Sequence, residues 1–586
     1  MSKKKKKKEK EKDFHKQKQT SKISSDALPI AQKPIIQLII LIMLTVICLA
    51  PFADKAFHID DPLFLWTAQQ IQNHPADFYG FLVNWEKSEM PMHEVTKNPP
   101  LTAYYIALVA SLIGWSEIAL HFAFLIPAIA VALGTYFLAR QFCMQPVVAS
   151  LAGMLTPVFL VSSTSVMCDT MMLAFWVWAV FLWVKGIESE KFSQLFLASL
   201  FIAASALTKY FGMSLIPLLL IYSLVKKRRI GFWLLFLSIP VIILVSYQWF
   251  THMLYGKGLL SDAASYASSV RKAEGTQFLH KGLIGLAFTG GCLISVLFYS
   301  TLLWSRRLLA GGVILAGVSV FILSSIKTIG LYPLIEANTV RWDLVIQLSI
   351  FAIGGLSLLA LTATDFWKRR DAVSLLLFLW ISGTFIFATF INWTINARSI
   401  LPIVPAVGII VARRIDQLGK LSQSKNRWYI LWPLIPAAVI SLFVTWADYT
   451  LANTARSAAT QILHEYKNKN RAGTIWFQGH WGFQYYMESG GGKAIDITQS
   501  QLTHGDVVII PLNNDNIYPL PHEIASPERE IELVPCRWLS TSNYFAGAGF
   551  YAHFLGPLPF RVGPVPPEKY FIFLVTKSIK FIPEKT

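Results

Sequence analysis

Two adjacent carboxylates, Asp60 and Asp61, are the residues of this chain that are best suited to chemistry. They follow the first long apolar stretch, residues 34–52, and apolar side chains flank them within residues 58–66. A carboxyl group beside an apolar wall and a second carboxylate has a raised pKa, which suits a general base near neutral pH. Paired acids can alternatively hold a divalent cation. Because carboxylates at the mouth of a membrane span are costly to desolvate, the pair predicts a functional site.

Cationic side chains form the second half of this predicted site. They lie at the ends of apolar stretches or in the polar segments between them, at Lys97, Lys209, Arg271, Arg341 and Arg398. Several cations on one face of a membrane suit the phosphate of an anionic lipid, which Arg binds in bidentate fashion and Lys as a point charge. The alternative is that these side chains only extend from span ends toward the interface.

The composition indicates a polytopic membrane protein that has to position these residues. Of its 586 residues, 54% are apolar and 15% are charged, which excludes an ordinary soluble multidomain enzyme. Stretches of near-spanning length recur at 34–52, 118–139, 146–163, 167–184, 193–207, 210–225, 230–250, 282–304, 308–326, 344–363, 372–392, 399–412 and 428–447. They predict an all-α membrane domain of about 13 transmembrane helices over residues 34–449.

The basic residues orient this domain. Lys and Arg clusters follow every second apolar stretch, so the positive-inside rule predicts a cytoplasmic amino terminus and an extracytoplasmic segment after Tyr449. The alternation holds only if residues 99–114 do not cross the membrane. We therefore expect them to form a juxtamembrane or re-entrant helix within the first extracytoplasmic loop, residues 53–117.

Of the net charge of +18, +8 lies in the first 22 residues. Residues 1–22 hold eleven lysines against three acidic residues, and residues 1–33 are predicted to be a disordered cytoplasmic tail. This tail either contacts anionic membrane lipids or only sets the topology. No aromatic or glycine pattern accompanies the lysines, so no nucleic-acid partner is expected.

Residues 450–586 are predicted to fold as a small extracytoplasmic α/β domain. Residues 474–477 and 505–511 have the pattern of strands, and residues 481–488 have that of a helix. The five cysteines of the chain are scattered without paired spacing, which indicates neither a disulfide framework nor a zinc site.

Five short motifs occur in a fixed order along the chain. They are the acidic pair Asp60-Asp61, Asn98-Pro-Pro-Leu101, Asp169 within residues 166–170, Leu207-Thr-Lys-Tyr-Phe-Gly212 and Arg398-Ser-Ile-Leu-Pro402. In this order the chain resembles the GT-C superfamily of lipid-dependent glycosyltransferases, in its protein-mannosyltransferase and aminoarabinose-transferase branch. The resemblance covers most of residues 34–450 and implies the GT-C fold.

The resemblance also implies roles. Asp60 would deprotonate the acceptor hydroxyl, and Asp61 would assist it or coordinate a metal. Together with the cations above, this gives donor phosphate contacts at Lys97, Lys209, Arg271 and Arg398, and supporting positions at Asn98, Asp169, Tyr210 and Arg341. One departure is Asn98, which stands where family members commonly carry Lys or His.

A divalent cation is the one cofactor that the sequence leaves open. Its candidate ligands are Asp61, His93 and Glu94, although no ligand spacing enforces a site.

The implied activity is transfer of a sugar from a polyprenyl-phosphate donor to a hydroxyl of lipid A, another glycan or a protein. Adjacent carboxylates flank a glycosidic bond poorly, which favours a single inverting displacement. The absence of outer disulfides favours a bacterial inner membrane. A polyprenyl-linked glycan ligase or polymerase shares this chemistry and stays open. A lipid or solute transporter is the other alternative, against which stand the absence of a visible internal repeat and the position of the charged residues at span ends.

Overall fold

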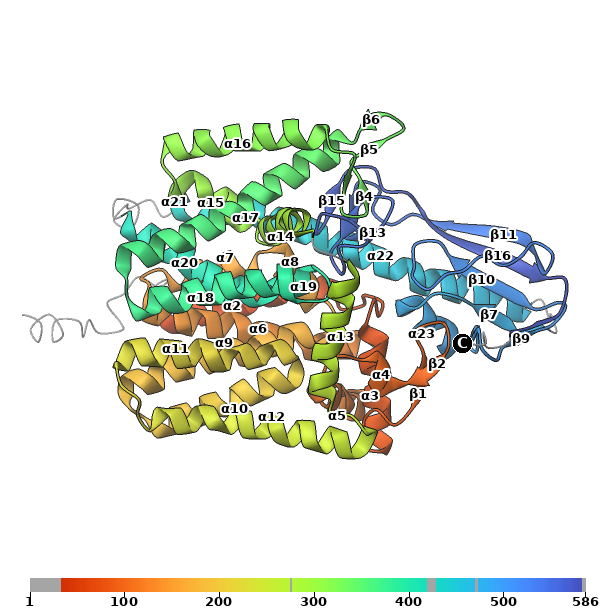
Figure 1. Ribbon diagram of the computed structural model, residues 1–586, viewed down its shortest axis with the longest axis horizontal. Coiled ribbons are helices and arrows are strands. Elements are labelled where there is room, and N and C mark those ends of the chain that lie inside the picture. Colours follow the sequence, from red (N-terminus) through yellow and green to blue (C-terminus); the bar gives the residue numbers. More distant parts are fainter. Residues whose placement is uncertain (1–32, 275–276, 419–427, 469–472, 582–586) are drawn as a thin grey trace, which may run out of the picture.

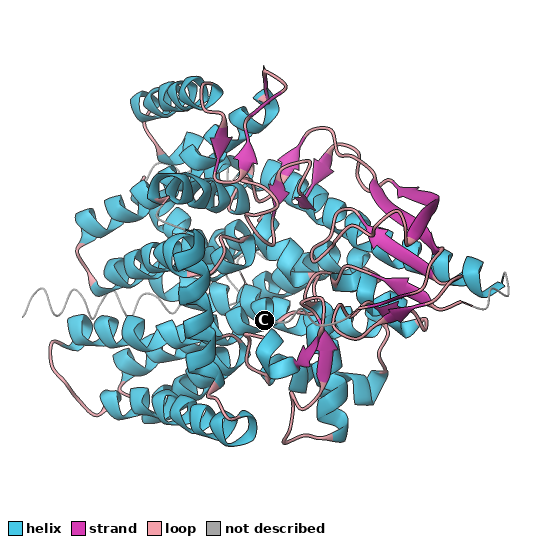
Figure 2. Ribbon diagram, turned by 45° about the vertical axis from the view of Figure 1, so that its right-hand side comes forward, coloured by secondary structure: helices cyan, strands magenta, loops and turns pink. Residues whose placement is uncertain are grey.

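The computed structural model of the chain describes residues 33–274, 277–418, 428–468 and 473–581 (Figure 1). The predicted basic tail lies outside these residues except for Lys33. Helices fill one side of the molecule, and most of the strands gather at the other side (Figure 2). The predicted combination of a helical membrane domain and a smaller strand-containing region is therefore confirmed.

Every apolar stretch that was predicted to span the membrane is helical. The helices are α2 (Pro34–Leu49) with η3 (Ala50–Phe52), α6 (Glu117–Phe142), α7 (Pro146–Met154), α8 (Pro157–Ser163), α9 (Cys168–Ser189), α10 (Phe192–Thr208), η4 (Tyr210–Ser214), α11 (Leu215–Lys227), α12 (Trp233–Tyr255), α14 (Phe278–Cys292), α15 (Ser295–Leu303), α16 (Arg306–Ser324), α17 (Trp342–Arg369), α18 (Ala372–Ile386), η5 (Phe387–Ile391), α19 (Ala397–Ile400), η6 (Leu401–Ile403), α20 (Val404–Gln417), α21 (Trp428–Leu431) and α22 (Leu434–Asn468).

Within the described ranges, nine helices are long and apolar enough to cross a membrane, or eleven if each of two bent helix pairs counts as one span. This is fewer than the predicted thirteen, for two reasons. First, α10 has only 17 residues, which is about 26 Å of helix. Second, the stretch at 399–412 is divided, because the short α19 and η6 precede an α20 of 14 residues.

The two bent pairs bring short helices together inside the bundle. The pair α7–α8 bends by 68°, and the pair α14–α15 by 85°. Pro157 begins α8, and Thr156 before it has the extended backbone that a following proline favours. Gly290 in α14 lies against α17, where an added Cβ would come within 1.9 Å of the Phe351 carbonyl oxygen. The proline accounts for the first bend, and the glycine allows the close contact between α14 and α17.

Residues 53–117 fold into short elements at one end of the bundle. They are α3 (Asp61–Asn73), the hairpin of β1 (Leu82–Asn84) and β2 (Glu89–Pro91), α4 (Met92–Val95) and α5 (Leu101–Ile113). The 13 residues of α5 extend about 20 Å, which is too short to cross a membrane and fits the predicted juxtamembrane helix. A further helix, α13 (Leu259–Glu274), runs across the ends of neighbouring helices (Figure 1).

The carboxy-terminal region contains the predicted α/β unit. Its five-stranded sheet has the order β11-β16-β10-β7-β8, and β10, β7 and β8 run parallel. The long helix α22 leads into this region from the bundle (Figure 1). The elements are β7 (Ile475–Phe477), α23 (Trp481–Ser489), β8 (Lys493–Ala494), β10 (Val507–Pro511), β11 (Ala525–Leu533) and β16 (Glu568–Val575). Short strand pairs elsewhere are β3 (Thr328–Ile329) with β4 (Tyr332–Pro333), β5 (Ile335–Glu336) with β6 (Thr339–Val340), and β9 (Gln501–Leu502) with β17 (Ile579–Lys580).

Residues 536–563 do not pack within this sheet. They form the small pairs β12 (Leu539–Ser540) with β15 (Arg561–Val562) and β13 (Ser542–Asn543) with β14 (Ala548–Gly549). Their buried apolar side chains share one core with the helix bundle: Cys536, Leu539, Phe550, Tyr551, Leu558 and Phe560. The predicted boundary at residue 450 therefore does not separate two independent cores.

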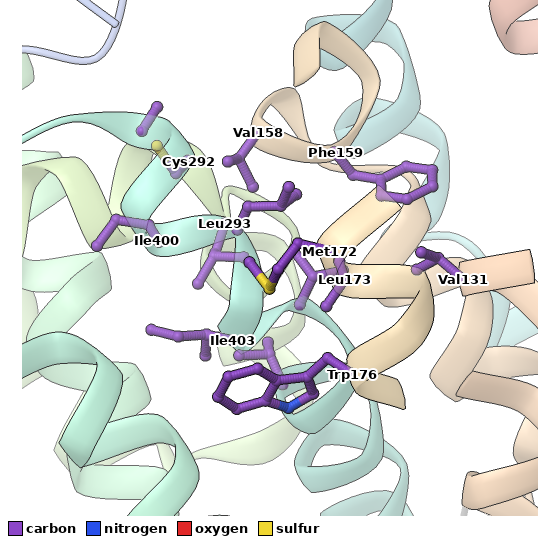
Figure 3. Close-up of a cluster of buried hydrophobic side chains, with 14 of the residues drawn as sticks. Val131, Val158, Phe159, Met172, Leu173, Trp176, Cys292, Leu293, Ile400 and Ile403 are labelled. Carbon is purple, nitrogen blue, oxygen red and sulfur yellow. The ribbon is translucent and has the colours of Figure 1, made fainter. Parts of the chain in front are cut away.

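One buried cluster fixes the helix ends that carry the predicted site. Side chains from α6, α8, α9, the end of α14, α19 and η6 meet there (Figure 3). Met172 lies one turn after Asp169 on α9, and Ile400 lies two residues after Arg398 on α19. Both side chains are almost completely buried. Because close-packed interiors resist displacement, the start of α9 and the turn of α19 are held at a fixed separation.

Candidate active site

Asp60 and Arg398 form an ion pair although 338 residues separate them. Asp60 directly precedes α3, and Arg398 lies in the single turn of α19. Nη2 of Arg398 donates a hydrogen bond of 2.8 Å to Oδ2 of Asp60. Their side chains are 13% and 26% exposed, respectively. The pair thus combines a charge-assisted hydrogen bond with a carboxylate that solvent reaches.

Asp169 and Lys209 extend this pair to four charged side chains. Asp169 lies in the first turn of α9, where the helix dipole favours a negative charge. Nζ of Lys209, at the end of α10, lies 2.5 Å from Oδ1 of Asp169. The other oxygen, Oδ2, lies 3.9 Å from Nη1 of Arg398. Asp60, Asp169, Lys209 and Arg398, called the charged cluster below, therefore form a continuous chain of opposite charges.

Two buried polar atoms of the charged cluster make no hydrogen bond to another described residue, Nε of Arg398 and Oδ2 of Asp169. In addition, Nη1 of Arg398 points at Sδ of Met167, 2.8 Å away, and a thioether is only a weak acceptor. Buried polar groups are almost always hydrogen bonded, so exceptions need an explanation such as a catalytic role. The guanidinium of Arg398 therefore retains the capacity to bind an anion.

Asp61 holds the turn that carries Asp60. Its side chain is completely buried, and its two oxygens accept backbone N–H groups of His58 and Val166, at 2.8 and 2.9 Å. Burial raises the pKa of Asp61 to about 7. Asp61 makes these bonds with backbone groups and not with Arg398. Its contacts tie the loop before α3 to the loop before α9.

The same turn contains a strained residue. Ile59 has φ of 48°, in the left-handed region that β-branched residues rarely adopt. Such conformations are costly and persist where surrounding contacts enforce them, which is often at functional sites. The strain therefore adds to the reasons for placing a functional residue at Asp60.

A second ionic group lies completely inside the protein. Nζ of Lys55 is 2.6 Å from Oδ2 of Asp448 on α22, and both side chains are 0% exposed. The hydroxyls of Thr541 and Tyr551 donate to the same carboxylate at 2.7 and 2.9 Å. We call these four residues the buried network. Sequence reasoning missed it, and the available signal was one Lys and one Asp at the ends of two predicted spans, before α3 and within α22.

Two of the predicted supporting residues flank the charged cluster. The side-chain oxygen of Asn98 lies 3.7 Å from Sγ of Cys168, the neighbour of Asp169. Tyr210 follows Lys209 directly, and its hydroxyl lies 3.1 Å from that of Tyr247.

Three predicted cations contact other parts of the molecule. Lys97 pairs with Asp262 on α13 at 2.6 Å. Arg271 donates from Nε to the carbonyl oxygen of residue 267 in its own helix. Arg341 donates to the hydroxyl of Tyr332 and to the carbonyl oxygen of residue 545. Of the five predicted cations, only Lys209 and Arg398 contact Asp60 or Asp169 in the described structure. The other three contact different neighbours.

The predicted metal candidates are not brought together. The ring of His93 stacks on Tyr255 at 4.8 Å, and Glu94 lies 3.8 Å from Lys257. Both oxygens of Asp61 accept backbone hydrogen bonds. In the part of the chain that the structure describes, no group of three acidic, His or Cys side chains is arranged to hold a metal ion.

Comparison with known proteins finds a family model that matches part of the helix bundle. Residues 97–249 match a family model described as dolichyl-phosphate-mannose-protein mannosyltransferase. The matched segment is about a quarter of the chain. The matched segment contains Asp169 and Lys209, whereas Asp60 and Arg398 lie on either side of it.

The solved structures that match the chain are only distantly similar to it. ArnT from Cupriavidus metallidurans in the apo state is 12% identical, with a TM-score of 0.45 over 80% of this chain and 92% of that chain. The same protein bound to undecaprenyl phosphate is 13% identical, with a TM-score of 0.44 over 83% and 94%. The arabinofuranosyltransferase AftD from Mycobacteria is 9% identical, with a TM-score of 0.38 over 94% and 40%. No curated protein sequence matches the chain.

Proposed function

We propose that this protein is a GT-C membrane glycosyltransferase that moves a sugar from a polyprenyl-phosphate donor to a hydroxyl group of its acceptor. The observation that carries the proposal is the charged cluster, in which Asp169 joins Lys209 to the ion pair of Arg398 and Asp60. Glycosyl transfer from a lipid phosphate needs a base for the hydroxyl and cations for the departing phosphate. The matched family, whose description names dolichyl-phosphate mannose, supports a lipid-phosphate donor.

Arg398 and Lys209 are the proposed contacts of the donor phosphate. Arg398 offers the fork of its guanidinium, including the unbonded Nε, and Lys209 offers a point charge on a side chain that is 22% exposed. When the bond between C1 of the sugar and the phosphate oxygen breaks, the electron pair leaves with that oxygen. The two cations then stabilise the negative charge of the released polyprenyl phosphate.

Asp60 is the proposed general base. Its side chain is the most exposed of the charged cluster, so an acceptor hydroxyl can approach it from solvent. The hydroxyl oxygen attacks C1 while its proton passes to Asp60. Asp61 is buried with both oxygens bonded, and the side chain of Asp169 is only 2% exposed, so neither is placed to act as a nucleophile. A single displacement that inverts the anomeric centre fits this arrangement.

The proposed setting is the bacterial inner membrane, with the amino terminus in the cytoplasm and the charged cluster on the opposite face. The polyprenyl chain of the donor would then remain in the bilayer while its sugar phosphate reaches the cluster. The acceptor would be a lipid, a glycan or a protein that presents a hydroxyl at that face.

The direct test is mass spectrometry of envelope glycolipids and glycoproteins from a strain that lacks the gene. One sugar modification is expected to disappear, to return with the wild-type chain and to remain absent with Asp60→Asn at equal membrane levels. Loss of a general base lowers rates by roughly 10²–10⁴-fold. Glu86→Gln, at an exposed acid of the same loop, is the matched control and should restore the modification.

Restoration by Asp60→Asn would contradict the role of Asp60 as the base. An unchanged envelope in the strain that lacks the gene would contradict the proposed function itself.

A further inference from the structure

The carboxy-terminal segment 536–563 places one residue against the charged cluster. The ring of Tyr551 lies under the guanidinium of Arg398, with the central carbon 5.6 Å from the ring centroid. This is within the range of cation–π attraction. Tyr551 is only 4% exposed, so the contact is shielded from water. Residue 551 is therefore positioned to influence Arg398 although it lies beyond the predicted boundary of the membrane domain.

Backbone contacts fasten the two loops that carry these residues. The N–H of Ala397, directly before Arg398, donates to the carbonyl oxygen of Phe550, directly before Tyr551, at 2.8 Å. The N–H of His553 donates to the carbonyl oxygen of Ile395 at 2.9 Å. The residues directly before Arg398 are thus held at two points by the carboxy-terminal segment.

The hydroxyl of Tyr551 is held within a second group, the buried network. It donates to Asp448, which is neutralised by Lys55 in the buried network. Lys55 lies five residues before Asp60 in the chain, and the ring of His58 packs edge-on against Tyr551 at 5.5 Å. A single aromatic side chain therefore links the loop of Asp60 to the loop of Arg398.

We propose that Tyr551 is a positioning residue that presents the guanidinium of Arg398 to the donor phosphate, so that the carboxy-terminal segment forms part of the active site. The inference rests on the proposed function of the charged cluster. A long Arg side chain loses conformational entropy when it binds a ligand. Because the ring of Tyr551 already restricts the guanidinium of Arg398, less entropy is lost on binding. The ring of Tyr551 serves the active site, and its hydroxyl serves the stability of the fold.

The experiment separates these two parts of the side chain. The full-length protein in lipid nanodiscs is titrated with undecaprenyl phosphate, and thermal unfolding is recorded for each variant. Tyr551→Leu removes the ring and is expected to weaken binding roughly tenfold. Tyr551→Phe keeps the ring and is expected to bind within about twofold of wild type, while unfolding at a lower temperature because Asp448 loses one donor.

Tyr544→Leu is the matched control, because Tyr544 lies in the same segment but packs against Tyr332. It is expected to leave binding unchanged. If Tyr551→Leu does not fold, Tyr551→Met decides the question, since its flexible apolar side chain fills similar space without a ring.

Binding by Tyr551→Leu at wild-type affinity would overturn the inference. So would losses of affinity in the Leu and Phe variants that only follow their losses of stability. Arg398→Met identifies the other failure. If it binds as tightly as wild type, or if wild type itself does not bind undecaprenyl phosphate, the proposed function fails and the inference falls with it.

Discussion

The charged cluster and the buried network are both ionic, yet their surroundings differ. In the buried network, the pair of Lys55 and Asp448 is 0% exposed, and two hydroxyls complete the bonding of the carboxylate. In the charged cluster, Asp60 and Arg398 are 26% and 13% exposed, and Nε of Arg398 has no hydrogen-bond acceptor among the described residues. A saturated and dry ion pair suits a scaffold, whereas an accessible and incompletely bonded one suits binding and catalysis.

Equivalent substitutions should lower activity in the charged cluster and stability in the buried network. Arg398→Met is expected to lower sugar transfer by roughly 10²–10³-fold, because the departing phosphate loses a preorganised cation. Stability should change by less than about 1 kcal/mol, since the remaining Asp60 carboxylate can be hydrated. Transfer assays in membranes and thermal unfolding of the purified protein measure the two effects. Near-normal transfer would remove Arg398 from the proposed mechanism.

Lys55→Met should show the opposite pattern. It leaves the carboxylate of Asp448 buried without a cation, which typically costs about 3–5 kcal/mol of stability. The fraction that folds should keep its specific activity within a few-fold, because Lys55 does not contact the charged cluster in the described structure. The double variant Lys55→Met with Asp448→Leu should recover part of the loss. Unfolding temperatures equal to wild type for Lys55→Met would contradict the scaffold role.

Glu568 sharpens the comparison, because it is a buried carboxyl that forms no ion pair with another described residue. It accepts hydrogen bonds from the side-chain amides of Asn513 and Asn543, and burial raises its pKa from 4.5 to about 7. The folded protein therefore keeps a proton that the unfolded chain releases, so this contribution to stability falls as pH rises from about 4.5 and is lost by about pH 7.

Glu568→Gln retains the acceptor oxygen but cannot ionise. It should match wild type near pH 5 and exceed its stability by roughly 2–3 kcal/mol near pH 8. Unfolding measured at both pH values tests this. An equal difference between variant and wild type at the two pH values would show that Glu568 does not titrate as stated.

Lys97→Met should have the smallest effect. Lys97 and Asp262 are 20% and 24% exposed, and partly exposed pairs contribute about 0–1 kcal/mol. Because Lys97 faces α13 and not Asp60, undecaprenyl phosphate should bind within about twofold of wild type. A tenfold loss of affinity in Lys97→Met would return this residue to the donor site.

The residues of the charged cluster could be predicted from the sequence, whereas the contacts that hold them in place could not. The sequence predicted Asp60, Asp169, Lys209 and Arg398 as one group because each lies in a short motif at the end of an apolar stretch. The alternation of basic clusters then indicated that these ends lie on the same face of the membrane. The helix positions followed from apolar length, and the errors in span number lie where helices are short or divided. The strands at 474–477 and 505–511 were likewise visible as local patterns.

The contacts of Tyr551 could not be predicted in this way. Its partners Arg398 and Asp448 lie 153 and 103 residues away, and no local periodicity indicates that segment 536–563 returns to the helix bundle. The placement of Lys97 was missed for a related reason, since its partner on α13 is separated from it by 165 residues. Local patterns determine elements, but only tertiary packing determines which charges meet.

The most direct measurement is a structure of the full-length protein in a lipid nanodisc with undecaprenyl phosphate bound. The account predicts the phosphate within hydrogen-bond distance of Arg398 and Lys209, the guanidinium still lying on the ring of Tyr551, and Asp60 facing the side from which an acceptor approaches. A phosphate bound beside Lys97 and Lys257, with the charged cluster untouched, would contradict it.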